Sequence, residues 1–481
     1  MELGKLLERL EVLESTAAPE TEITAVCYDS RSAVKGALFV AICGYETDGH
    51  KYAASAKEKG AAVLLCQYVP EGLDMPYVRV KDTRRALALV SAAFYGYPAE
   101  KLNIVGVTGT NGKTTSTTLI KEVIERCTGD KVGLIGTNRN MIGDEELPTE
   151  RTTPESADLQ ELFARMVEKG CKWAVMEVSS HSLYLGRVEG IRFHTGVFTN
   201  LTQDHLDFHK TMQAYAEAKA ILFANCDRAV INIDDEYGPF MAESAKCPVL
   251  SVSVGKNEAG LVAKNVKLAA DRVEFLAVTM GEVERITLGI PGAFSVYNAL
   301  SALGFALGAG IKLSAAAAAL ACCSGVKGRA EVVPAGEGYT VLIDYAHTPD
   351  ALENILNTAK GFAQGRVVAL FGCGGDRDRT KRPKMGAIAA ELADYVIVTS
   401  DNPRTEQPGE IIKDILEGMK DTKTPYTVIE NRREAIWYAL ENAQPGDVII
   451  LAGKGHETYQ IIGKEKHHMD EREIVADYFK R

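Results

Sequence analysis

The sequence lacks the features of a disulfide-stapled, zinc-binding or membrane-spanning protein. Its ten cysteines are scattered and form no CxxC pair, so we expect reduced and mostly buried thiols. The longest weakly polar stretch, residues 299–311, is shorter than the roughly 20 residues that span a bilayer. The N-terminus is charged and helical in period, unlike a signal peptide. We therefore expect a cytoplasmic protein without a membrane span.

Basic residues are also scarce relative to acidic ones. The chain has 54 lysines and arginines against 65 aspartates and glutamates, and its formal net charge is −11. This balance argues against general binding to the phosphate backbone of nucleic acids, and we expect no nucleic-acid partner. Any anionic ligand must therefore be held by local cations and by the N-termini of helices.

Apolar runs that read as strands alternate with helical segments along all 481 residues, which predicts the α/β class. At about 150 residues per domain, this length predicts about three domains. We place them at residues 1–98, 99–328 and 329–481, with the second boundary at a hinge over residues 325–329. We expect a mostly parallel, P-loop ATPase-like sheet in the central domain and a doubly wound, Rossmann-like sheet in the C-terminal domain. The strand candidates of the latter are residues 340–343, 367–371, 395–398 and 448–451.

A glycine-rich loop follows the first strand candidate of the central domain, residues 102–107. Residues 108–115 read TGTNGKTT and precede a helical pattern. Glycines let backbone N–H groups approach phosphate oxygens, Lys113 supplies a mobile positive charge, and the Thr114 hydroxyl suits Mg²⁺. The strict pattern GxxxxGK[ST] is not met, because Val107 stands where its first glycine would be. The strand, loop and helix context nevertheless predicts a nucleotide-phosphate site.

The loop and four further segments resemble the Mur ligases, ATP-dependent enzymes that form amide bonds in bacterial cell-wall synthesis. The segments are GTNGKTT (109–115), EVSSHSL (177–183), NLTQDHLDFH (200–209), GAFSVYNALSA (292–302) and DYAHTPDAL (344–352). The likeness covers nearly the whole chain. Two other segments are similar to the branch of the family that adds meso-2,6-diaminopimelate: GCGGDRDRTKRP (372–383) and SDNPRTE (400–406). The DNPR form resembles the diaminopimelate recognition motif, and lysine-adding relatives differ there.

The resemblance implies one ligand for each domain. The N-terminal domain would bind the UDP end of UDP-N-acetylmuramoyl-L-alanyl-D-glutamate, the central domain ATP, and the C-terminal domain the incoming amino acid. ATP would convert the substrate carboxylate to an acyl phosphate, which the amine attacks while phosphate leaves. The positions that match ATP contacts of the family are Gly109, Thr110, Asn111, Gly112, Lys113, Thr114, Thr115, Asn298, Arg329, Asp344 and His347.

The resemblance also implies the catalytic and metal-binding residues. Thr114 and Glu177 would ligate one Mg²⁺, and His205 would help to hold a second. Composition alone makes Lys219 a helix-face lysine with a solvated head, but the matching family lysine carries a CO₂-derived carbamate. A neutral amine can take up CO₂, and the resulting carbamate is a negatively charged acceptor. The catalytic candidates are therefore Lys113, Glu177, His205 and Lys219. The candidate metal ligands are Thr114, Glu177, His205 and Lys219.

The same resemblance implies the residues that bind the two substrates. The UDP substrate would contact Ser30, Thr152, Thr153, Ser179 and Arg187. Many relatives have glutamine where this chain has Leu185, which puts one polar contact in doubt. For diaminopimelate, the planar fork of Arg404 can hold a carboxylate with two hydrogen bonds. The remaining matches are Arg377 for a second carboxylate, Glu457 for the ammonium, and Asp401, Asn402, Pro403 and Gly453.

Two other functions stay open at this point. A folylpolyglutamate synthetase-like ligase shares the phosphate loop, but it gives no reason for the DNPR segment. A nucleotide switch that binds and slowly hydrolyses ATP without ligation also suits the EVSSH and DHLD segments. A need for both UDP substrate and diaminopimelate in phosphate release separates a ligase from a switch. We expect a monomer, and lysine stays open as a poor alternative substrate.

Overall fold

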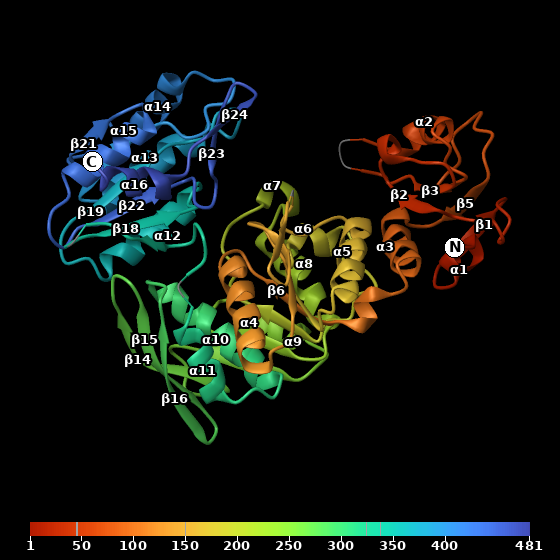
Figure 1. Cartoon of the computed structure of the whole chain (residues 1–481), viewed down its shortest axis with the longest axis horizontal. Helices are drawn as coiled ribbons and strands as arrows, with labels where there is room; N and C mark the ends of the chain where they lie inside the picture. Colours follow the sequence, from red (N-terminus) through yellow and green to blue (C-terminus); the bar gives the residue numbers. More distant parts are fainter. Residues whose placement is uncertain (45–46, 150, 324, 337) are drawn as a thin grey trace. The chain divides into compact units, whose positions relative to one another are not determined.

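A computed structural model describes residues 1–44, 47–149, 151–323, 325–336 and 338–481 (Figure 1). The chain forms two compact units: Met1–Leu261 with Ser301–Lys312, and Val262–Leu300 with Leu313–Arg481. Strands and helices alternate in both units, so the predicted α/β class is confirmed. The three domain boundaries placed from the sequence stay predictions. Among the described residues, no helix combines the length and the apolar character that crossing a bilayer requires.

The N-terminal part of the first unit is a small sheet in the order β1-β5-β4-β3-β2. Strands β2 to β5 pair in parallel and β1 runs antiparallel to β5. Strands β3 and β4 are buried at every position, as the apolar runs predicted. The elements are α1 Leu3–Leu7, β1 Val12–Ser15, β2 Ala25–Cys27, η1 Ser30–Ser32, β3 Ala37–Val40, η2 Gly49–Tyr52, α2 Ala53–Glu58, β4 Val63–Cys66, β5 Tyr77–Val80, α3 Thr83–Phe94 and η3 Pro98–Lys101.

The rest of the first unit is built on a larger, mostly parallel sheet, as predicted. Within this unit, eight of its strands follow the order β13-β12-β11-β6-β10-β7-β8-β9. Among these eight strands, the antiparallel pairs are β7 with β8 and β8 with β9. The elements are β6 Asn103–Thr108, α4 Lys113–Thr128, β7 Val132–Ile135, β8 Asn140–Ile142, β9 Glu145–Leu147, α5 Ser156–Glu168, β10 Trp173–Glu177, α6 Ser180–Tyr184, β11 Thr195–Phe198, α7 Leu206–His209, α8 Met212–Ala224, β12 Ala229–Asn232, α9 Gly238–Ser244 and β13 Val249–Ser253.

The second unit contains a six-stranded sheet in the order β17-β18-β22-β19-β20-β21. Leu342 and Ile450 face the core formed with α12 to α14, whereas Ile343 and Ile449 face α15 and α16, so both faces are covered as in a doubly wound fold. The elements are β17 Glu331–Val333, β18 Thr340–Asp344, α12 Pro349–Lys360, β19 Val367–Phe371, α13 Lys381–Leu392, β20 Tyr395–Val398, α14 Pro408–Glu417, β21 Tyr426–Val428, α15 Arg432–Glu441, β22 Val448–Ala452, β23 Tyr459–Ile462, β24 Glu465–His468 and α16 Glu471–Tyr478.

The four predicted strands of the C-terminal sheet correspond to β18, β19, β20 and β22. Strands β17 and β21 were not predicted, because each has three residues and neither is fully buried. Also not predicted were strands β14 (Leu261–Leu268), β15 (Val273–Thr279) and β16 (Glu282–Leu288). The chain passes between the units at the start of β14, within α10 (Ala293–Gly308), and before α11 (Leu313–Ala321).

Parallel strands bring their carboxyl ends to one edge of a sheet, and that edge carries the loops of interest. In the first unit, β10 and β11 flank β6, and residues 109–112, 178–179 and 199–205 follow β6, β10 and β11. In the second unit, residues 372–377, 399–404 and 453–457 follow β19, β20 and β22.

Candidate active site

The phosphate loop is shaped by two glycines. Strand β6 ends at Thr108 and helix α4 begins at Lys113. Gly109 has a φ of 152°, and a Cβ at this position would lie 1.9 Å from the Thr199 Oγ1 atom. Gly112 caps α4 with a φ of 84°, in the left-handed region. The first turn of α4 therefore presents its backbone N–H groups at the loop, which is how helices bind phosphate.

The loop is held from the neighbouring strand β11. The backbone N–H of Thr110 donates to the Asn200 carbonyl at 2.9 Å, and that of Asn111 donates to the Asn200 side-chain oxygen at 2.9 Å. The Thr199 hydroxyl donates to the Asn111 carbonyl at 2.6 Å. The loop shape is thus fixed by residues about 90 positions away in the sequence.

Two lysines converge on the Gly109 carbonyl oxygen. The Lys113 Nζ atom lies 2.8 Å from it and 2.7 Å from the Thr110 carbonyl, and the Lys219 Nζ atom lies 2.9 Å from it. Lys219 is 1% exposed, and its ammonium lies 4.5 Å from the Tyr215 ring centroid. It is therefore a core residue of α8 and not a solvated helix-face lysine. Burial and the nearby Lys113 charge lower the pKa of Lys219 well below its ordinary value.

Glu177 ends β10 beside the start of the phosphate loop, since it pairs in register with Val107. Its side chain is buried, and its two oxygens accept hydrogen bonds from the Thr137 N–H and hydroxyl, each at 2.9 Å. The Thr137 Oγ1 atom also lies 3.0 Å from the Thr152 Oγ1 atom, within hydrogen-bond distance. The predicted metal ligand Glu177 and the predicted substrate contact Thr152 therefore lie in one hydrogen-bonded group.

Three other predicted substrate contacts meet at the same strand end. The Thr153 hydroxyl donates to the Glu177 carbonyl at 2.9 Å and accepts from the Ser179 N–H at 3.1 Å. Arg187 donates to the Thr153 carbonyl at 3.1 Å, and its Nε atom lies 3.3 Å from a Glu155 oxygen. Burial lowers the pKa of Arg187. This group places a guanidinium and two hydroxyls together, which suits an anionic substrate.

His205 lies on the segment that follows β11. Its backbone is left-handed, with a φ of 53°, and its side chain is exposed. The ring packs edge-on against His181, with the centroids 4.8 Å apart. The Thr202 N–H donates to the Thr110 hydroxyl at 3.0 Å, which ties this segment to the phosphate loop.

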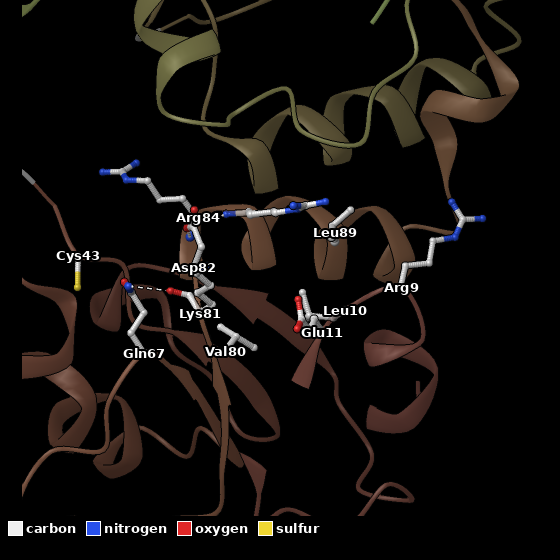
Figure 2. Close-up of a pocket in the computed structure, with 11 residues that line it drawn as sticks. Arg9, Leu10, Glu11, Cys43, Gln67, Val80, Lys81, Asp82, Arg84 and Leu89 are labelled. Atoms are coloured by element: carbon white, nitrogen blue, oxygen red, sulfur yellow. Dashed lines mark hydrogen bonds between the residues drawn. The ribbon is translucent and has the colours of Figure 1, made fainter. Parts of the chain in front are cut away.

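The N-terminal sheet carries a pocket of about 590 Å³ at the start of α3 (Figure 2). Lys81, Arg84 and Arg85 line it, and Figure 2 shows the Gln67 side chain bonded to the Lys81 carbonyl, at 3.1 Å. Ser30 lies in η1 of the same sheet region but does not line the pocket. These cations were not predicted from the sequence, although two arginines directly after a strand and an aspartate cap are a visible signal.

The other four predicted ATP contacts belong to the second unit. The Asp344 carboxylate accepts from the Ala330 N–H at 2.7 Å, and burial raises the pKa of Asp344. The Arg329 guanidinium lies 5.2 Å from the centroid of the Tyr345 ring. Burial lowers the pKa of His347. Asn298 is a buried residue of α10. A joint site of these residues with the phosphate loop stays a prediction.

The predicted diaminopimelate residues come together from three loops. The Gly375 N–H donates to the Asn402 carbonyl at 2.9 Å, and Arg404 donates to the Gly375 carbonyl at 2.8 Å. A Cβ on Gly453 would lie 2.7 Å from the Asp401 Oδ2 atom. The loops after β19, β20 and β22 therefore form one surface, and the glycines permit their close approach.

The loops also fix how the arginines are presented. A Cβ on Gly375 would lie 1.9 Å from the Pro403 carbonyl oxygen, so the two loops pack backbone against backbone. Arg404 has a left-handed φ of 52°, and its N–H donates to the Ile461 carbonyl at 3.1 Å. Arg377 is exposed, at the edge of the same loop cluster. One half-buried and one exposed guanidinium thus flank the loops, an arrangement that suits two carboxylates.

A buried arginine joins these loops and was not singled out from the sequence. Arg382 is 0% exposed and donates to both Glu406 oxygens at 2.8 and 2.9 Å, to Asp414 at 2.8 Å, and to the Gly374 carbonyl at 3.2 Å. The Asp376 N–H donates to Glu406 at 2.6 Å. Hydrogen bonds from Arg382 lower the pKa of Glu406 to about 2. The position of Arg382 inside the GCGGDRDRTKRP segment was the sequence signal that could have identified it.

Comparisons with known proteins show the family to which the chain is similar. Profiles described as "Mur ligase family, catalytic domain", "Mur ligase middle domain" and "Mur ligase, glutamate ligase domain" match residues 22–95, 107–306 and 328–455. A Clostridium botulinum protein named UDP-N-acetylmuramoyl-L-alanyl-D-glutamate--2,6-diaminopimelate ligase is 49% identical over 100% of both chains. A Caldanaerobacter subterraneus protein of the same name is 52% identical over 95% of each.

Solved structures show the same fold. A structure titled as UDP-N-acetylmuramoyl-L-alanyl-D-glutamate--2,6-diaminopimelate ligase superposes with a TM-score of 0.74 at 33% identity, covering 100% of this chain and 99% of that one. Mycobacterium tuberculosis folylpolyglutamate synthase reaches 0.61 at 19% identity, covering 77% and 92% respectively, which shows a shared fold alone. Family profiles along the whole chain and full-length relatives near 50% identity lead to one conclusion: the chain belongs to the Mur ligase family.

Proposed function

We propose that this protein is the ATP-dependent ligase that adds meso-2,6-diaminopimelate to UDP-N-acetylmuramoyl-L-alanyl-D-glutamate in peptidoglycan precursor synthesis. The observation that carries the proposal is the convergence of Arg377, Asn402, Arg404 and Glu457 on three adjoining loops of the second unit. Diaminopimelate has two carboxylates and two ammonium groups, and this cluster offers two guanidiniums and a carboxylate. The names of the full-length relatives support the same assignment.

The reaction activates a carboxylate and then joins it to an amine. The D-glutamyl carboxylate takes the γ-phosphoryl group of ATP and releases ADP, and the diaminopimelate amine attacks the acyl phosphate and expels phosphate. Lys113 leaves the Gly109 and Thr110 carbonyls to neutralise the outer phosphates. Arg187 holds the anionic substrate beside Glu177. Arg404 and Glu457 orient the amine.

The residues around Glu177 fit Mg²⁺, which prefers oxygen ligands. The Glu177 carboxylate is buried next to the phosphate loop, and the Thr114 hydroxyl belongs to the first turn of α4. When bound, Mg²⁺ supplies positive charge that stabilises phosphoryl transfer. Thr114 and Glu177 would hold one ion, and His205 with Lys219 would help to hold a second.

Lys219 is also suited to carry a carbamate. Its pKa is lowered by burial and by Lys113, so a larger share of the amine is neutral. The neutral amine adds to CO₂, one N–C bond forms, and one proton is released. We expect Lys219→Ala to lose turnover and short carboxylates to restore part of it. The exposed Lys246→Ala is the matched control and should keep wild-type turnover. Full turnover of Lys219→Ala without added carboxylate would contradict the carbamate.

An amino-acid panel tests the proposed substrate. The UDP-muramoyl-dipeptide and ATP are supplied with meso-diaminopimelate, lysine, ornithine or D-alanine, and ADP and amide product are measured together. We expect efficient product formation with diaminopimelate and weak formation at best with lysine, because lysine lacks the second carboxylate. Preferential use of another amino acid would overturn the assignment.

The proposal includes the setting and organisation of the enzyme. The reaction takes place in the cytoplasm, where ATP and the UDP precursor are made available, and the enzyme works as a monomer. Residues 1–98 bind the UDP end, residues 99–328 bind ATP, and residues 329–481 bind the amino acid. The basic pocket beside α3 is a candidate for the UDP end. Sedimentation analysis measures the oligomeric state, and a stable dimer would contradict the monomer.

A further inference from the structure

A buried lysine lies behind the predicted diaminopimelate residues. Lys454 is 0% exposed, at the carboxyl end of β22. Its Nζ atom donates to the Asn402 side-chain oxygen at 2.9 Å, to the Glu457 Oε2 atom at 2.7 Å, and to the Tyr459 carbonyl. An ammonium has three N–H donors, and these three acceptors use all of them. Lys454 is therefore directed at the protein and not at the substrate.

The contacts of Lys454 fix the orientation of Asn402. Its side-chain oxygen accepts from Lys454 and from the Ile461 N–H, the latter at 2.9 Å. With the oxygen held by two donors, the amide nitrogen must face the other way. That nitrogen donates to the Glu457 Oε2 atom at 2.9 Å. One buried ammonium thus determines which end of the amide meets Glu457.

The same contacts fix Glu457. Both Lys454 and Asn402 bind its Oε2 atom, whereas none of the hydrogen bonds found among the described residues involves Oε1. The Glu457 side chain is 13% exposed, so the carboxylate reaches the surface while its Oε2 atom is turned inward. Oε1 is thereby left as the acceptor for an ammonium from outside.

Stability alone is a poor explanation for this lysine. Burying an ammonium is costly, and a buried ion pair is often no more stable than apolar residues of the same size. The neighbouring Arg432–Glu471 pair already anchors the loops, since Arg432 donates to the Ala452 and Ser400 carbonyls at 2.8 and 3.4 Å. Lys454 instead contacts the two side chains that are predicted to meet the substrate.

We propose that Lys454 is a positioning residue of the amino-acid site, which holds Asn402 and turns Glu457 so that its Oε1 atom accepts the substrate ammonium. The inference rests on the proposed function, because it assumes that Glu457 binds diaminopimelate. Lys454 acts through its neighbours and has no contact with the reacting atoms. Its loss should therefore weaken binding of the amine more than it slows the chemical step.

The test compares Lys454→Met with Lys466→Met in the full-length enzyme. Both ammonium groups lie near the Tyr459 ring, at 5.4 and 4.3 Å from its centroid, but Lys466 is exposed and bonds to neither Asn402 nor Glu457. We expect Lys454→Met to raise the KM for diaminopimelate by about 10-fold or more, the loss expected for a charged hydrogen bond. The KM for ATP and kcat should change less than about threefold. Lys466→Met should match the wild type.

A double-mutant cycle separates positioning from a general structural role. Glu457→Gln and Lys454→Met each break the same pair, so the double variant should have a diaminopimelate KM close to that of the worse single variant. Additive effects, or a diaminopimelate KM for Lys454→Met within about twofold of wild type, would overturn the inference. Equal rises in the KM for ATP and for diaminopimelate would also overturn it.

A charge-keeping variant covers the case in which Lys454→Met does not fold. Lys454→Arg keeps the positive charge, but a planar guanidinium cannot direct three donors as an ammonium does. It should therefore fold and still raise the diaminopimelate KM, and an unchanged value would contradict the positioning role. If the wild type itself does not use diaminopimelate, the proposed function fails. If the wild type uses diaminopimelate and the Lys454 variants have an unchanged KM for it, the positioning role of Lys454 fails instead.

Discussion

The phosphate loop and the predicted amino-acid loops hold their cations in different ways. In the phosphate loop, a cation rests on backbone carbonyls: Lys113 donates to the Gly109 and Thr110 oxygens. In the amino-acid loops, the cations are held in ion pairs with side chains, such as Arg382 with Glu406. The first arrangement leaves one cation, Lys113, that can move to a ligand. In the amino-acid loops, buried cations instead fix the side chains that are predicted to touch the amino acid.

This difference predicts which effect amino-acid substitutions have at each site. A phosphate can be bound by many N–H groups, so the loop needs a backbone shape and one mobile charge. A diamino acid must be distinguished from lysine, which requires side chains at defined positions. We therefore expect substitutions in the first site to abolish turnover and those in the second to change the amine that is used.

The largest expected effect is at Lys113. Lys113→Ala removes the charge that neutralises the outer phosphates, and we expect kcat to fall by about 1,000-fold or more. Steady-state ADP release measures the change, and thermal unfolding checks that the variant folds. A fall of less than about 10-fold would show that the loop backbone alone is sufficient, which would weaken the contrast with the amino-acid site.

The next effect is at Arg404. Arg404→Ala removes the fork that binds a substrate carboxylate, so the KM for diaminopimelate should rise by about 10- to 100-fold. The KM for ATP should stay within about twofold, because the phosphate loop is untouched. The exposed Arg433→Ala serves as the control. Equal rises for the two substrates would show that Arg404 supports the fold and not the amino acid.

A smaller effect is expected at Glu406, where the comparison concerns stability. Arg382 lowers the pKa of Glu406 from 4.5 to about 2. The folded state then binds fewer protons than the unfolded state, so the pair contributes fully above pH 4.5 and loses its contribution as the pH falls towards 2. Glu406→Gln should lower the free energy of unfolding by about 1–2 kcal/mol at pH 7, with a difference that shrinks in acid.

Denaturant unfolding of Glu406→Gln and wild type at pH 7 and near pH 3 measures this difference. Glu410→Gln, in an exposed pair with Lys413, is the matched control and should leave the unfolding free energy unchanged at both pH values. A Glu406→Gln deficit that is the same at both pH values would show that the Arg382 pair does not stabilise the loops.

The sequence predicted the strand, loop and helix around residues 109–115 because their signal is continuous. Residues 109–115 supply the glycines, the lysine and the helix start within seven positions. The strands β19 and β20 were also predicted with their observed bounds, since buried parallel strands read as unbroken apolar runs. The short edge strands β17 and β21 give no such run and were not predicted.

The amino-acid site could be predicted only in part. Arg404 and Glu457 match family motifs. In contrast, Arg382 contacts Glu406, which is 24 positions away, and Lys454 contacts Asn402, which is 52 positions away. Composition favours a solvated head for any such lysine or arginine. Burial of Lys219, Arg382 and Lys454 depends on tertiary packing, which no local pattern records.

We expect the protein to use ATP for ligation and not to hydrolyse it as a switch. The most direct measurement is ADP release by the full-length protein with each substrate alone and with both together. We predict that rapid release requires ATP, the UDP-muramoyl-dipeptide and meso-diaminopimelate together, with one amide formed for each ADP. Equally rapid ADP release without diaminopimelate, or without amide formation, would contradict the ligase assignment.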